Sequence, residues 1–149
     1  MREAPLFRII SASLIAGIVL TLFLKVVEWL TAESVYTLLL NVDYIPVLKR
    51  YTFSEWIEVT FHLIVSVIVG FCFYVFFQKM QIHAAKKQIT YTICCSVLIG
   101  LCLFPTTEFS LRTPKVTNVD ALLYWLIGHA LFGYVFGSLF VNTKPRHSS

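Results

Sequence analysis

Four long apolar runs, separated by polar stretches, dominate the pattern of this chain. They cover Ile9–Leu30, Val59–Phe77, Ile89–Phe104 and Ala121–Val141. A helix needs about 20 predominantly apolar residues to cross the hydrocarbon core of a bilayer. The first, second and fourth runs meet this requirement. The third is shorter, and we expect it either to include Gln88 and Pro105 at its ends or to require a locally thinner bilayer.

The runs predict one all-α membrane domain over residues 1–149, built as a four-helix transmembrane bundle. The helices are expected at about 7–30, 55–78, 88–105 and 120–141. The first run could instead be a signal peptide, because Arg2 and Arg8 precede it. Lys25, Glu28 and Trp29 stand where the small residues of a cleavage site would belong. We therefore expect the first helix to be retained.

The connections between the runs differ in kind. The first outer loop contains Val35–Leu40, which is too short to span a membrane and too apolar for a free loop. It predicts a short interfacial or re-entrant helix. The second outer loop contains Pro105 and Pro114, and is therefore not expected to be helical throughout.

Composition supports a membrane protein. The chain is 58% hydrophobic and 13% charged, whereas soluble domains are nearer half apolar and a quarter charged. The excess apolar surface predicts the lipid bilayer as a partner. No basic stripe with interleaved aromatic residues is present, so nucleic acid is not an expected partner. The four cysteines lie inside apolar runs without metal-ligand spacing, and we interpret them as packing residues.

The distribution of lysine and arginine predicts the orientation. With the N-terminus inside, the cytoplasmic segments carry Arg2, Arg8, Lys79, Lys86, Lys87, Lys144 and Arg146, and the opposite side carries Lys49, Arg50, Arg112 and Lys115. Such a bias places both termini in the cytoplasm. The three tryptophans, Trp29, Trp56 and Trp125, would all mark outer helix ends, as in an interfacial aromatic belt.

Each predicted helix carries two small residues four positions apart. The pairs are Ser13 and Gly17, Ser66 and Gly70, Ser96 and Gly100, and Gly133 and Gly137. Small residues let helix backbones approach closely in lipid, where no hydrophobic force drives the helices together. We expect these pairs to pack the bundle of this chain. Self-association through Gly133 and Gly137 is the alternative.

Three helices also keep ionisable residues at similar depths in the outer half. They are Lys25, Glu28, Glu58, His62 and His129. Such residues are costly in a membrane and usually face the bundle interior. We expect them to form one cluster, with the two imidazoles within side-chain contact.

Three interpretations of this cluster stay open. Histidine titrates near neutrality, so the cluster could relay or sense protons. His62, His129 and Glu58 could instead bind a zinc-like cation, which is the weaker chemical alternative. The third interpretation is purely structural: Lys25 and Glu28 reach the headgroups, and the histidines join helices by hydrogen bonds. No nucleophile–base constellation, phosphate-binding loop or HExxH motif is present, so neither an enzyme nor a cofactor is expected.

Several short segments resemble the YagU-like inner-membrane proteins, a family without an assigned biochemical activity. They are Leu14-Ile15-Ala16-Gly17 followed by Glu28, Glu58-Val59-Thr60-Phe61-His62, Phe104-Pro105, and Ile127-Gly128-His129. The resemblance implies a four-helix protein of the bacterial cytoplasmic membrane and supplies no catalytic residues. Val35–Leu40 departs from the family, which usually has a proline-rich first outer loop.

Two functions follow as expectations. The first is a small polytopic membrane protein that handles or senses protons or small cations through the outer-half cluster. The second is a non-catalytic membrane subunit or scaffold that docks a partner. A second copy of the chain and another membrane protein are both open as partners.

Overall fold

The structure is a computed structural model that describes residues 5–42, 45 and 47–141, and all of its regular elements are helical. The long helices are α1 (Pro5–Thr31), α3 (Glu55–Lys79), α4 (Ala85–Leu103) and α5 (Val119–Phe140). The short ones are α2 (Val35–Leu40) and the 3₁₀ helices η1 (Leu48–Arg50) and η2 (Phe104–Phe109). Four helical segments are long and apolar enough to cross a membrane, which indicates a multi-pass membrane protein.

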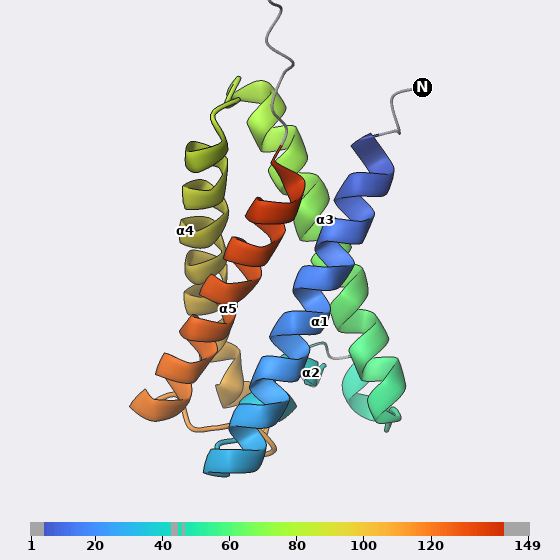
Figure 1. Ribbon diagram of the computed structural model, residues 1–149. Helices are drawn as coiled ribbons and strands as arrows, with labels where there is room; N and C mark the ends of the chain where they lie inside the picture. Colours follow the sequence, from blue (N-terminus) through green and yellow to red (C-terminus); the bar gives the residue numbers. More distant parts are fainter. Residues whose placement is uncertain (1–4, 43–44, 46, 142–149) are drawn as a thin grey trace, which may run out of the picture.

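The four long helices run up and down, but their order in space differs from their order in the chain (Figure 1). Helix α1 packs against both α3 and α5, and α4 packs chiefly against α5. The spatial order is therefore α3, α1, α5, α4. Helices α3 and α4 follow each other in sequence, yet they meet mainly near their shared turn, where the rings of Phe76 and Tyr91 lie 5.9 Å apart.

The third apolar run belongs to a helical segment that is longer than the run itself. Helix α4 begins at Ala85, and the buried Gln88 side chain donates a hydrogen bond to the Ile82 carbonyl at 2.7 Å. The path does not end at Pro105, because η2 continues it to Phe109. Proline is tolerated in the first turn of a helix, where its missing N–H is not needed. The whole segment is 25 residues long, so a thinner bilayer is not required.

The small residues of α1 and α3 interlock. A Cβ atom added to Gly17 would lie 2.7 Å from Ser66 Oγ, and one added to Gly70 would collide with Ser13 Oγ. Each glycine of one helix therefore receives the serine of the other. This reciprocal fit brings two antiparallel helices into close contact without large side chains.

Two glycines of α5 pack directly against the backbone of α4. A Cβ atom on Gly133 would lie 2.5 Å from the Thr92 carbonyl oxygen, and one on Gly137 would lie 3.0 Å from Ile89 Cα. Both glycines are thus covered within the chain. Neither glycine therefore offers an open surface for self-association.

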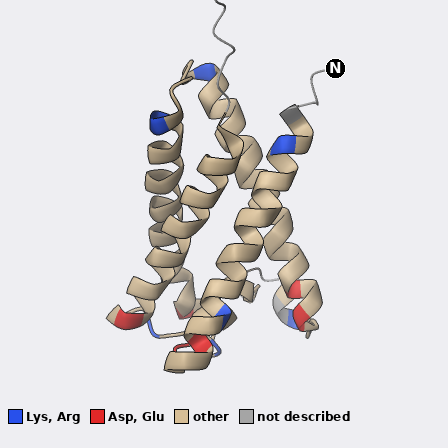
Figure 2. Cartoon of the chain, in the orientation of Figure 1, with Lys and Arg blue, Asp and Glu red and all other residues tan. Residues whose placement is uncertain are grey.

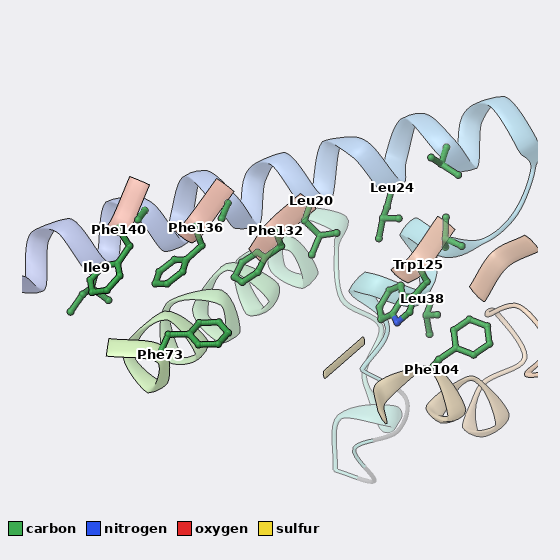
Figure 3. Close-up of a cluster of buried hydrophobic side chains, with 14 of the residues drawn as sticks. Ile9, Leu20, Leu24, Leu38, Phe73, Phe104, Trp125, Phe132, Phe136 and Phe140 are labelled. Atoms are coloured by element: carbon green, nitrogen blue, oxygen red, sulfur yellow. The ribbon is translucent and has the colours of Figure 1, made fainter. Parts of the chain in front are cut away.

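Aromatic side chains fill the interior between α5, α3 and α1 (Figure 3). Phe132, Phe136 and Phe140 stack along α5, with the Phe136 and Phe140 ring centroids 5.3 Å apart. Phe73 of α3 contacts Phe136 at a centroid distance of 5.5 Å. Phe136 has no exposed surface, so this ladder belongs to the fully buried part of the core.

The acidic residues gather at one end of the bundle, whereas basic residues lie at both ends (Figure 2). All the described acidic residues lie at the end that carries α2, here called the acidic end: Glu28, Glu33, Glu55, Glu58, Glu108 and Asp120. The other end, here called the basic end, carries Arg8, Lys79, Lys86 and Lys87. Among the described residues, the basic end has no carboxylate.

Candidate functional site

A cavity of about 120 Å³ lies toward the acidic end, lined by residues of the four long helices, α2 and η2. We call it the His–Glu cavity. Its polar lining consists of Asn41, Glu58, His62, Ser66, Ser96, Thr106 and His129. A single water needs only about 10–15 Å³ measured in this way, so the cavity has room for several waters or a small molecule.

His129 reaches the cavity from the middle of α5. Its Nδ1 lies 2.9 Å from the Trp125 carbonyl oxygen, which can only accept a hydrogen bond. Nδ1 is therefore the protonated nitrogen, and Nε2 of the neutral ring carries the lone pair. A Cβ atom on Gly100 would lie 2.7 Å from the imidazole Cγ, so this glycine makes room for the ring.

His62 reaches the same cavity from α3. Its Nε2 lies 3.5 Å from Ser66 Oγ, while the Ser66 hydroxyl donates to the His62 carbonyl at 3.0 Å. The imidazole also hydrogen-bonds the backbone carbonyl of Gly17 on α1. His62 is therefore held by its own helix and by a neighbour, with its ring at the cavity wall.

Glu58 supplies the carboxylate of the cavity. It lies in the first turn of α3, and only 6% of the residue is exposed. Arg112, from the outer loop before α5, places Nη1 3.6 Å from Glu58 Oε1. A buried carboxylate needs a partner to remain charged. The half-exposed guanidinium provides this partner at the outer side of the cavity.

Ser96 contributes a buried hydroxyl to the lining. Its Oγ has no hydrogen-bond partner among the described residues, although only 2% of the residue is exposed. Leaving such a group unsatisfied costs about 1–3 kcal/mol. Ser96 lines the cavity, and its hydroxyl would bind a water or a ligand group there once the side chain turned toward the space.

Lys25 and Glu28 do not line the cavity, so the predicted five-residue cluster divides into two groups. Lys25 Nζ lies 2.5 Å from Glu55 Oε1 and 5.0 Å from the centre of the Tyr36 ring. Glu28 accepts hydrogen bonds from the backbone N–H and the hydroxyl of Thr37, both at 2.8 Å. Both residues hold α2 to the bundle.

Helix α2 forms a roof over the cavity at the acidic end. The lining includes the adjoining residues Leu38–Val42. The Tyr36 hydroxyl donates to Glu55 Oε1 at 2.5 Å. Burial, followed by this hydrogen bond, raises the pKa of Tyr36 well above its usual range. Tyr36 therefore remains a protonated donor at physiological pH, and its bond to Glu55 persists.

The roof gives a first testable prediction. Glu28→Ala removes both acceptors of Thr37, so the amides of Val35–Leu40 should exchange at least tenfold faster, because each lost hydrogen bond is worth about 1 kcal/mol. Amide exchange followed by mass spectrometry in nanodiscs measures this effect. Glu108→Ala, at an exposed carboxylate of the same end, is the control and should leave α2 protected. Unchanged protection in Glu28→Ala would refute the role of Glu28.

Trp125 does not belong to the predicted interfacial aromatic belt. Trp29 and Trp56 are 82% and 81% exposed, as expected of residues at an interface, whereas Trp125 is 3% exposed. Its Nε1–H donates to the Gly100 carbonyl at 2.8 Å, and its ring lies 4.4 Å from that of His129. Trp125 therefore fixes α5 to α4 beside the cavity. Its position near a helix end did not reveal which way it faces.

The zinc-like alternative is not supported by the geometry. In the part of the chain that the structure describes, no three His, Cys, Asp or Glu side chains converge closely enough to hold a metal ion. His62, His129 and Glu58 surround a common space without pointing at a common centre.

The chain matches no protein-family model, no curated protein and no solved structure. The functional argument therefore comes from the geometry of the cavity.

Proposed function

We propose that this protein binds and releases protons at the His–Glu cavity, as a multi-pass protein of the cell membrane. The observation that carries the proposal is that His62 from α3 and His129 from α5 line one cavity, together with Glu58. Two helices that are not neighbours in the chain thus bring their imidazoles to one polar space.

The chemistry of these groups suits proton exchange. Histidine is the side chain whose charge changes between about pH 5 and 8. Nε2 of His129 is the basic atom of its ring, because Nδ1 donates to Trp125. Water bound at the Ser96 hydroxyl would provide a path to that atom. The Glu58 carboxylate, which lines the same cavity, is the group whose charge is opposite to that of a protonated imidazole.

The orientation belongs to the same proposal. The basic end would face the cytoplasm, in accord with the positive-inside rule, and the cavity would then lie in the outer half of the membrane. Helix α2 would be an interfacial roof rather than a re-entrant segment, since it is pinned near the membrane surface by Glu28 and Glu55. The resemblance to YagU-like proteins favours a bacterial inner membrane.

The alternative function, a scaffold for a partner, has weaker support. It predicted a small-residue face left open for docking. The Ser13–Gly17 pair is covered by α3, and the Gly133–Gly137 pair is covered by α4.

Trp125 provides a direct test of proton binding. Its ring is 4.4 Å from that of His129, and a protonated imidazole quenches indole emission at such a distance. In a Trp29→Phe, Trp56→Phe background, Trp125 fluorescence should fall in one step as the pH is lowered from about 8 to about 4. His129→Gln should abolish this step, and His62→Gln should shift its midpoint.

The control is His83→Gln, which changes a half-buried histidine near the basic end, outside the cavity, and should leave the step unchanged. Thermal unfolding of each variant verifies that the bundle is intact. A parent protein without a fluorescence step, or a step that survives in His129→Gln, would overturn the proposal.

A further inference from the structure

We propose that the His–Glu cavity, together with a groove between α3 and α4, binds an uncharged membrane lipid with a hydroxylated head, of the diacylglycerol class. The head would occupy the cavity and one acyl chain the groove. This inference requires only the shape and the hydrogen-bonding groups of the site. It uses His129 in its neutral form, with Nε2 as an acceptor, and does not require that the imidazole exchange protons.

The groove is open and apolar, with a volume of about 270 Å³. It is lined by Val69, Cys72, Phe73 and Phe76 of α3 and by Cys95 and Ile99 of α4. Val69 and Ile99 also line the His–Glu cavity, so the two spaces adjoin each other. A chamber with several polar groups in a mostly apolar wall thus adjoins an apolar groove, as an amphipathic ligand requires.

The arrangement of the helices explains why the groove opens to lipid. Helix α3 packs on α1, and α4 packs on α5, which leaves the space between α3 and α4 unfilled. The Phe76–Tyr91 contact closes it only near the turn. On the aqueous side, α2 roofs the cavity. A ligand would therefore enter laterally from the bilayer.

The hydrogen-bonding groups of the cavity select the head. Glu58 and Nε2 of His129 are acceptors, and the Ser96 hydroxyl lacks a partner in the described structure. Hydroxyl groups satisfy all three, because they both donate and accept. A head group that carries only carbonyl oxygens needs hydrogen-bond donors. Among these three groups, only the Ser96 hydroxyl can donate. A phosphate head would meet the Glu58 carboxylate, whose neighbouring Arg112 is already paired.

The size and direction of the site agree with such a lipid. A cavity of about 150 Å³ admits benzene, so one of about 120 Å³ suits a glycerol head. Glu58 and His62 lie roughly 5–10 Å below the start of α3, and the groove follows α3 for roughly another 10 Å, from Val69 to Phe76. The head would point to the acidic end and the chain to the basic end.

Quenching of Trp125, which lines the cavity, tests the site. The Trp29→Phe, Trp56→Phe protein in nanodiscs would receive diacylglycerol brominated near the head end of its acyl chains, at a fixed pH of about 8. Bromine quenches indole only at near contact, so saturable quenching of Trp125 is expected. Phosphatidylcholine with the same brominated chains should quench at least tenfold less at equal concentration.

Two adjacent cysteines supply matched variants. Cys95→Phe fills the groove and should weaken diacylglycerol binding at least tenfold, whereas Cys94→Phe adds the same ring at an exposed position outside it and should bind normally. Ser96→Ala preserves the shape of the site but removes one hydrogen bond, and should weaken binding about fivefold. Because Ser96→Ala is a mild change, it still tests the lipid site if the Cys95→Phe protein does not fold.

Equal quenching by the two lipids, non-saturable quenching, or equal binding by Cys95→Phe and Cys94→Phe would overturn the lipid site. Tighter binding of a brominated quinone would overturn the hydroxylated head. Because the pH is held fixed, these results are separate from the pH titration of the same reporter. Either proposal can therefore fail while the other holds.

Discussion

Phe136→Ala is expected to lower the free energy of unfolding by about 2–3 kcal/mol, the cavity part of the cost of removing a fully buried aromatic ring. The Phe136 side chain has no exposed surface and contacts the rings of Phe73, Phe132 and Phe140. In a membrane, transfer of a side chain from protein to lipid costs little, because both are apolar. The expected loss therefore comes from the packing contacts of the ring and from the cavity left behind.

Phe71→Ala is the control, because it removes an aromatic ring that faces lipid instead of the packed interior. Phe71 is 47% exposed on the outer face of α3, where a lipid tail can replace the missing ring. We expect this variant to lose less than about 1 kcal/mol. Reversible unfolding in mixed micelles measures both. A similar loss in the two variants would show that the aromatic ladder does not hold the bundle together.

Gly133→Leu should destabilise the protein by about 3 kcal/mol or more, at the upper end of the overpacking range. Even the Cβ atom would meet the backbone of α4, at 2.5 Å from the Thr92 carbonyl oxygen and 2.7 Å from Ile93 Cα. A backbone cannot rotate away as a flexible side chain can. The two helices would therefore have to separate.

Ser138→Leu is the control, because Ser138 lies on the same helix but on its exposed side. Thermal unfolding should show a large decrease for Gly133→Leu and little change for Ser138→Leu. Amide exchange in the middle of α4 should rise only in the first variant. If Gly133→Leu is as stable as the control, the close approach of α4 and α5 is not essential.

Sequence alone predicts the helices of this protein well, because apolar length is a one-dimensional property. The expected span at 120–141 corresponds to α5 at Val119–Phe140, and the short helix over Val35–Leu40 is present as α2. The small-residue pairs are also informative. Close approach in lipid leaves few residue types that fit, so a glycine or serine every four residues marks a packed face.

The partners of polar side chains are less predictable. Lys25 and Glu28 are three residues apart on one helix, a spacing that favours a mutual pair. Instead Lys25 binds Glu55 on α3 and Glu28 binds Thr37 on α2. These choices depend on how each helix is rotated and on where α2 docks. Neither rotation nor docking is encoded in the local pattern of one helix.

The position of α5 after the other long helices in the chain has a consequence for membrane insertion. Helix α5 leaves the ribosome after the other three long helices, yet it is the main partner of both α4 and α1. Helix α4 is therefore inserted into the bilayer before α5, its main packing partner, is present. Its Thr92 hydroxyl donates to the Ile89 carbonyl of the same helix at 2.9 Å, so this polar group does not have to wait for a neighbour. Insertion can thus proceed one helix at a time, while the assembled bundle closes only with the arrival of α5.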